Sequence, residues 1–202
     1  MVKAAEELNY PLIDLPISYQ ERLSEANIED CLVDESDFLD DVFKNIIELS
    51  EKNRNEVLFL CFKVYAHRSE DYIEEHLKSS KCIPCSPDGS CIKECSEIVD
   101  PCASFSYLYD QSDQVFPLDR FHKDKLVHSS MKDLGMIHNY LPLAMIVERA
   151  RTILSLSSRD KKKALKKSMI LLQCITQLMS QRDGRNVLLS KAEELMLSLI
   201  HI

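Results

Sequence analysis

Glycine is scarce in this chain of 202 residues, which holds only three glycines and no tryptophan. Average glycine usage is about 7%. Loops that cradle phosphate groups depend on glycine, because it accepts backbone angles that other residues avoid. Phosphate-binding motifs need closely spaced glycines, whereas Gly89, Gly135 and Gly184 lie far apart. We therefore expect no nucleotide-binding loop and no cofactor.

The chain also lacks a run of eighteen apolar residues and a hydrophobic, signal-like segment near its start. We therefore predict a cytoplasmic protein with no membrane partner. In that compartment the eight cysteines should be reduced thiols, which makes a disulfide framework the less favoured interpretation. The chain stops within a helical pattern, so we expect it to be a fragment of a longer chain.

Charge is distributed unevenly along the chain. Residues 1–100 contain 10 Lys and Arg against 23 Asp and Glu, while residues 101–202 contain 15 against 10. The two halves should therefore attract each other or bind different partners. Hydrophobic residues make up 45% of the sequence, which is enough to form a buried core.

Helical spacing of apolar residues predicts the structure of the first half. Residues 1–30 indicate a short helix and then an extended strip that contains Pro11 and Pro16. Amphipathic helices are predicted at 34–50, at 55–66 and from Ser69, as a cap, to about Ser79. Positions expected on the buried faces of the first two are Phe38, Leu39, Val42, Phe43, Ile46, Ile47, Val57, Leu58, Cys61, Val64 and Tyr65.

At Lys81 the pattern changes to that of a small β insert. Two short apolar segments flank the turn sequence Ser86-Pro87-Asp88-Gly89, which predicts a β-hairpin with a five-residue loop. Alternation of Phe105, Tyr107 and Tyr109 predicts a third strand.

Helical spacing returns after Phe116-Pro117. One helix should end at Gly135, a second should begin at Leu141-Pro142, and a third should begin at Ser158 or Asp160 and end at Asp183-Gly184. A final helix carries Leu188, Ala192, Leu195 and Leu199. The inward positions expected in the first three are Leu126, Val127, Met131, Leu134, Leu143, Ile146, Val147, Ala150, Ile153, Leu154, Leu165, Met169, Leu172, Ile175 and Met179.

These patterns predict an α+β fold that is predominantly α-helical. An acidic helical subdomain at 1–80 precedes a small antiparallel β-hairpin or three-strand insert at 81–116, and a helical bundle follows at 117–202. We expect the three parts to form one cooperative unit, in which the aromatic strand packs on Leu126, Met131 and Ile146.

Four cysteines in this insert have a spacing that suggests a metal site. Cys82, Cys85, Cys91 and Cys95 form C-x2-C-x5-C-x3-C, and hairpins that bring two thiolate pairs together are common zinc sites. The second pair is closer than in typical zinc ribbons, and no histidine supplements the set. Reduced structural thiols are the favoured interpretation, so we predict no metal and keep zinc as the alternative.

The start of the 158–183 helix is strongly basic, with Arg159, Lys161, Lys162, Lys163, Lys166 and Lys167. Such a cluster can neutralise phosphates, but no aromatic residue is interleaved for base stacking. We therefore predict a solvated face and no nucleic-acid partner. His67, His122, His128 and His138 show no arrangement with an acid and a nucleophile, so we predict no catalytic residue and no enzyme activity.

Several segments together resemble the internal repeats of the sacsin family of giant cytosolic chaperone-related proteins. They are Leu8-Asn9-Tyr10-Pro11, Ile98-Val99-Asp100-Pro101, Tyr109-Asp110, Phe116-Pro117, Leu134-Gly135-Met136 and Glu148-Arg149-Ala150. In that family each repeat begins with an ATPase module like that of the ninety-kilodalton heat-shock chaperones, and a helical-plus-β region without assigned chemistry follows. This chain is similar to the second region.

The resemblance transfers no ATP-binding residue, because the Asp-x-Gly-x-Gly turn and glycine-rich lid of the ATPase module are absent here. It implies a non-catalytic segment of a sacsin-like scaffold in folding quality control. The implied partners are proteins: neighbouring modules, chaperones or clients. The alternative is a small zinc-stabilised adaptor that binds a protein or nucleic acid through the basic helix.

Overall fold

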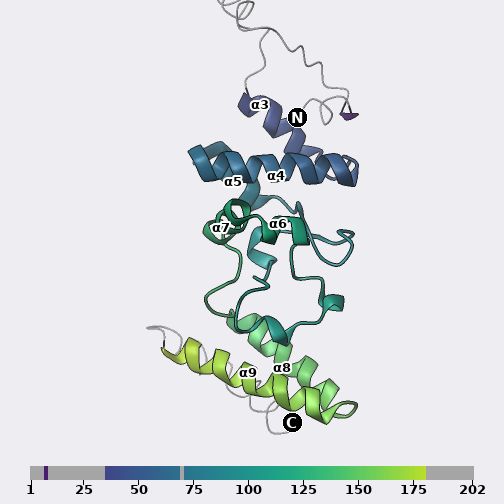
Figure 1. The fold of residues 1–202 in the computed structure, drawn as a ribbon, viewed down its shortest axis with the longest axis vertical. Helices are drawn as coiled ribbons and strands as arrows, with labels where there is room; N and C mark the ends of the chain where they lie inside the picture. The colour runs from purple at the N-terminus through teal and green to yellow at the C-terminus, as the bar shows by residue number, and fades with distance from the viewer. Residues whose placement is uncertain (1–6, 9–34, 69–70, 181–202) are drawn as a thin grey trace, which may run out of the picture. The chain divides into compact units, whose positions relative to one another are not determined.

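A computed structural model describes residues 7–8, 35–68 and 71–180 (Figure 1). The described chain is mainly helical with one two-stranded antiparallel sheet, which confirms the predicted fold class. The strip at 1–30, the Ser69 cap and the final helix that carries Leu188 lie outside these residues, apart from Glu7 and Leu8.

The chain forms two compact units, of which the first contains Met1–Ser96 and Leu118–Gly135 and the second contains Glu97–Pro117 and Met136–Ile202. Each unit is therefore assembled from two separate stretches of chain. These boundaries differ from the three consecutive parts drawn from the sequence, because residues 81–116 are divided between the units. That the whole chain unfolds as one cooperative unit stays a prediction.

The first unit begins with three helices, α3 (Glu35–Lys44), α4 (Glu51–Arg68) and α5 (Asp71–Ser79). Five of the six apolar positions predicted for the first of these helices are buried, but Ile47, which lies three residues beyond the end of α3, is 65% exposed. On α4, Val57, Leu58 and Cys61 are buried as predicted, whereas Val64 and Tyr65 are only half-buried.

The predicted β-hairpin is confirmed. β1 (Ile83–Pro84) pairs antiparallel with β2 (Ile92–Lys93). The Cys85 N–H donates to the Cys91 carbonyl oxygen at 2.8 Å, which closes the expected five-residue loop. Gly89 has φ +75°, the left-handed conformation that its place in the turn requires. A 3₁₀ turn, η2 (Cys95–Glu97), follows.

Two further helices, α6 (Asp119–Lys123) and α7 (Lys125–Asp133), complete the first unit. The Asp124 carboxylate caps α7 by accepting hydrogen bonds from the backbone N–H groups of Leu126 and Val127. Gly135, with φ +110°, follows the C-cap as predicted. Leu126 is 43% exposed, so its predicted inward position is wrong.

Residues 104–110 do not form the predicted third strand. They contain the 3₁₀ turn η3 (Ser106–Leu108), in which the Leu108 N–H donates to the Phe105 carbonyl oxygen at 3.0 Å. A repeat of three residues places Phe105 and Leu108 on the same side, and both are buried, whereas Tyr107 is 78% exposed. In so short a segment the apolar residues are compatible both with the two-residue repeat of a strand and with the three-residue repeat of a 3₁₀ turn. The alternation of aromatic residues was therefore misleading.

The second unit contains η3, the 3₁₀ turn η4 (Gln111–Asp113), and the helices α8 (Leu143–Ser157) and α9 (Lys161–Ser180). The two helices lie side by side (Figure 1). Their core includes Val99, Phe105, Leu108, Tyr109, Val115, Leu141, Ile146, Val147, Ala150, Ile153, Ala164, Leu171, Cys174 and Leu178. The Asp160 carboxylate accepts a hydrogen bond from the Lys163 N–H at 2.9 Å, so Asp160 begins α9, as one of the two predicted starts.

The face of α9 that packs inward is not the predicted one. Leu165 and Met169 are 61% and 60% exposed, and Leu172 and Met179 are both 52% exposed. The buried side chains of this helix are Ala164, Lys167, Ser168, Leu171, Cys174 and Leu178. Two mainly apolar stripes share this helix, and the structure buries the one that was not predicted. Of the predicted inward positions on α9, Ile175 is partly buried against the core.

Candidate interaction surface

An acidic turn fastens α8 and α9 within the second unit. Asp110 precedes η4 and Asp113 is its last residue. The two side chains cap the turn reciprocally, and the Asp110 N–H donates to the Asp113 carboxylate at 2.7 Å. This arrangement points the two carboxylates at different helices. Asp113 pairs with Arg149 of α8 at 3.0 Å, and Asp110 pairs with Lys163 and Lys167 of α9.

Arg149 lies inside this unit, with a side chain only 7% exposed. Its guanidinium stacks over the Tyr109 ring at 4.6 Å and donates to the Glu148 carboxylate at 2.6 Å. Burial alone would lower the pKa of Arg149, but the carboxylates of Asp113 and Glu148 outweigh it and raise that pKa. Tyr109-Asp110 and Glu148-Arg149-Ala150, which carried the family resemblance, therefore meet in one ion-paired cluster.

Lys167 is buried, with 7% of its side chain exposed, so its predicted place on a solvated face is wrong. Its ammonium group donates to the Leu108 carbonyl oxygen and to the Asp110 carboxylate, both at 2.9 Å. Burial disfavours ionisation of Asp110, but hydrogen bonds from Lys167 and Lys163 outweigh it and hold the Asp110 pKa below its ordinary value. The charge of Lys167 therefore anchors α9 to η3.

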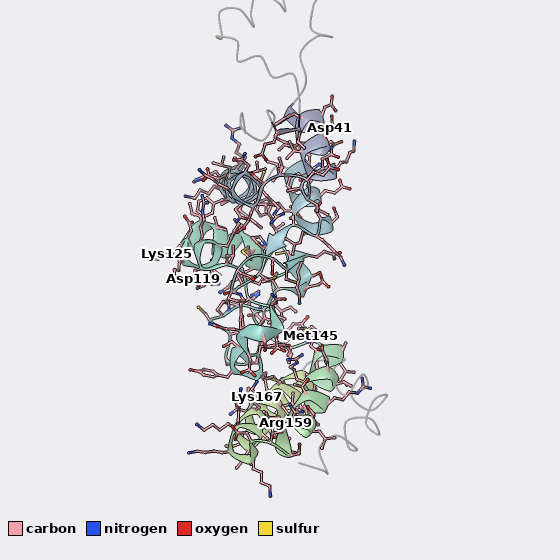
Figure 2. The ribbon with its side chains drawn as sticks, turned by 90° about the vertical axis from the view of Figure 1, so that its right-hand side faces the viewer. Asp41, Asp119, Lys125, Met145, Arg159 and Lys167 are labelled. Carbon is pink, nitrogen blue, oxygen red and sulfur yellow. The ribbon has the colours of Figure 1, made fainter. Side chains whose placement is uncertain are left out.

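The other basic residues near the start of α9 remain on the surface. Arg159, Lys161, Lys162 and Lys166 are exposed, and their side chains form no ion pair within the described residues. Figure 2 shows nitrogen-tipped side chains that project outward from the helix pair near Arg159 and Lys167. The predicted solvated face is thus confirmed for these four residues.

Beside them runs the exposed apolar stripe of α9, which we call the α9 seam: Leu165, Met169, Leu172, Thr176 and Met179. All five side chains are exposed. A groove of about 460 Å³, to which Ser104, Ile170 and Cys174 also contribute, is lined in part by Leu172 and Thr176. Exposed, contiguous apolar side chains commonly mark a protein interaction site. The α9 seam is therefore our candidate functional site.

The structure does not gather the four cysteines of the hairpin region into a ligand set. Cys82, Cys85 and Cys95 are buried and Cys91 is half-buried. Among the residues that the structure describes, no three of these sulfur atoms lie within 4.8 Å of one another. The Cys95 thiol donates instead to the Met131 carbonyl oxygen at 3.2 Å. Burial raises the pKa of Cys82 far above its ordinary value, which favours the neutral thiol there.

Two of the described histidines, His76 and His138, have local roles in packing and hydrogen bonding. His76 lies 2.6 Å from the Asp40 carboxylate and stacks on Phe43 with a centroid distance of 4.8 Å, which joins α5 to α3. His138 Nδ1 lies 2.8 Å from the Met136 carbonyl oxygen. His67 is exposed at the end of α4, and His122 and His128 are half-buried on α6 and α7.

Within the part of the chain that the structure describes, no helix is both long and apolar enough to cross a bilayer.

Comparison with known proteins reveals one distant similarity. The chain is 25% identical to human sacsin over 191 residues, which cover 91% of this chain and 4% of that protein. It thus spans a small fraction of the relative that it matches. No protein-family model matches the sequence, and no solved structure matches it either. The chain is therefore distantly similar to sacsin, in agreement with the resemblance derived from its motifs.

Proposed function

We propose that this chain is a non-catalytic segment of a sacsin-like chaperone scaffold and that it makes protein contacts through the α9 seam. The single observation that carries this proposal is the exposure of Leu165, Met169, Leu172 and Met179 on α9, because the opposite face of this helix packs in the core of the second unit. The distant similarity to sacsin over 91% of the chain supports the chaperone-related context.

The chemistry of the seam indicates the kind of partner. Its five positions are separated by four, three, four and three residues, which is the spacing that one helix presents to another. We infer that the partner is an amphipathic helix, either from a neighbouring part of the scaffold or from another protein. The unpaired cations Arg159, Lys161, Lys162 and Lys166 would favour acidic residues near one end of that helix.

A photoreactive residue at position 169 of the full chain tests this contact. We expect irradiation to attach position 169 to a polypeptide segment, which peptide mapping by mass spectrometry would identify. The matched control is position 47, an exposed isoleucine outside α9. Attachment no more frequent at 169 than at 47 would refute a contact function for the seam.

The non-catalytic part of the proposal has a separate test. Because the chain lacks closely spaced glycines, we expect isothermal titration to detect no ATP binding by the purified chain. Micromolar affinity for ATP, or hydrolysis above the rate of a buffer blank, would contradict a non-catalytic role while leaving the contact surface to the crosslinking experiment.

A further inference from the structure

Two of the five side chains in the α9 seam are methionines that solvent can reach. Met169 and Met179 are 60% and 52% exposed. They are ten residues apart in the sequence, so at about 1.5 Å of rise per residue they lie about 15 Å apart along the helix. Leu172 and Thr176 lie between them on the same line. A partner helix that runs along the seam therefore covers both sulfur atoms.

Other sulfur atoms of the described chain are better protected. Met131 and Met136 are 0% and 2% exposed. On α9 itself Cys174 is buried, and burial raises the pKa of its thiol to about 11, which keeps it protonated at neutral pH. Buried, protonated thiols are poor targets for oxidants. The reactive sulfur atoms of α9 are therefore those of the seam.

We propose that Met169 and Met179 are modification sites, whose oxidation to methionine sulfoxide by a peroxide prevents the partner from binding to the α9 seam. This inference rests on the proposed function, because it assigns a regulation to the same contact surface. The modification is reversible, since methionine sulfoxide reductases convert both sulfoxide epimers back to the thioether.

The chemical step needs only the thioether and the peroxide. A lone pair on sulfur attacks one oxygen atom of hydrogen peroxide, the O–O bond breaks and an S–O bond forms. The proton on the transferred oxygen passes to the other oxygen, which leaves as water. Sulfur gives up two electrons and the peroxide accepts them. The product is a polar side chain with a hydrogen-bond acceptor where an apolar one stood.

That acceptor opposes burial against an apolar partner, because the sulfoxide oxygen would lose its hydrogen bonds to water. The seam supplies no free donor in exchange, since the Thr176 hydroxyl already donates to the Leu172 carbonyl oxygen at 2.9 Å. The exposed Lys166 lies three residues from Met169 but thirteen from Met179, so it can reach only one of the two. At least one sulfoxide therefore stays uncompensated, which should weaken binding by about tenfold or more.

Peroxide treatment of the purified full chain tests the modification sites without reference to a partner. Peptide mapping by mass spectrometry measures the rate of sulfoxide formation at each methionine. We expect Met169 and Met179 to be oxidised at least about tenfold faster than Met131 and Met136, because access of the oxidant controls the rate. Equal rates at all four positions would refute the assignment of the seam methionines as modification sites.

A photoreactive residue at position 172 of the full chain tests the effect on binding. After peroxide treatment, a thiol reductant reverses disulfides and sulfenic acids, so that reversible cysteine oxidation does not contribute. We expect attachment at position 172 to fall by about tenfold or more. The matched control carries Met169→Leu and Met179→Leu, which keep the seam apolar and remove both oxidisable sulfur atoms. Its attachment should be the same before and after peroxide.

Two results would overturn the regulation. One is equal attachment by the treated and untreated chains, and the other is an equal loss in the Met169→Leu, Met179→Leu control, which would place the sensitive group elsewhere. Absence of attachment before any peroxide is added would instead refute the contact itself, and with it the proposed function. Failure of the regulation is therefore distinguishable from failure of the proposed function.

Discussion

The Lys167 ammonium group donates a hydrogen bond to the Leu108 carbonyl oxygen at 2.9 Å, which joins two segments separated by 59 residues in the sequence. Lys167→Ala removes this bond and the ion pair with Asp110. We expect it to lower the free energy of unfolding by about 1–3 kcal/mol, because a buried carbonyl loses its donor. Lys162→Ala is the matched control and should change stability by less than about 0.5 kcal/mol, since Lys162 is exposed. Urea titrations of both variants measure the difference, and equal stability of the two would contradict an anchoring role for Lys167.

Asp110→Asn should make stability less dependent on pH. The pKa of Asp110 is lowered in the folded chain, so its carboxylate stabilises the fold above the ordinary aspartate pKa of about 3.9. That contribution is lost as the pH falls through the lower, folded value. We expect the native chain to be more stable than the variant at pH 7, and the gap to close as the pH falls below about 4. Because the Asp110 side chain is 45% exposed, solvent screening keeps the effect small. A gap that is constant from pH 7 to pH 3 would rule out this ion pair as its source.

Ile146→Asp should unfold the second unit. Ile146 is fully buried in the core of that unit, and an unpaired carboxylate there costs about 4 kcal/mol or more. The matched control is Ile47→Asp, because Ile47 is 65% exposed. Hydrogen exchange followed by peptide mapping should show lost protection in α8 and α9 for the first variant only. Peptides from α4 and α7 then test whether the chain is one cooperative unit, because they lose protection together with α8 only in that case.

Metal removal should not affect this fold. We expect elemental analysis to find well below one zinc per chain and a chelator to leave the thermal melt unchanged, because structural zinc would supply a large share of the folding free energy. Replacing Cys85 or Cys91 by serine should cost about 0.5–3 kcal/mol, with the larger loss at the buried Cys85. Stoichiometric zinc and unfolding by the chelator would support the zinc-stabilised adaptor instead.

Local patterns were sufficient to predict most elements of this chain. The helices α3, α4, α7, α8 and α9 follow from apolar residues at helical spacing, and the hairpin follows from its turn sequence. Gly89 and Gly135 take the positive φ angles that their positions require, since these demands depend only on neighbouring residues. The family resemblance was likewise carried by short motifs that can be read without a structure.

Contacts between distant residues decided the rest. In α9, Leu165 and Leu171 belong to two stripes that are both mainly apolar and both helical in spacing, so periodicity could not select the one that faces the core. The structure buries the stripe of Leu171, which includes Lys167. The Lys167 ammonium group can be buried because it donates hydrogen bonds to the Leu108 carbonyl oxygen and the Asp110 carboxylate, both distant in the sequence. A charged lysine can be buried only when partners compensate for its lost hydration, and no local pattern reports partners that lie far away in the chain. The exposed seam is therefore a product of the tertiary structure, although every residue in it was visible in the sequence.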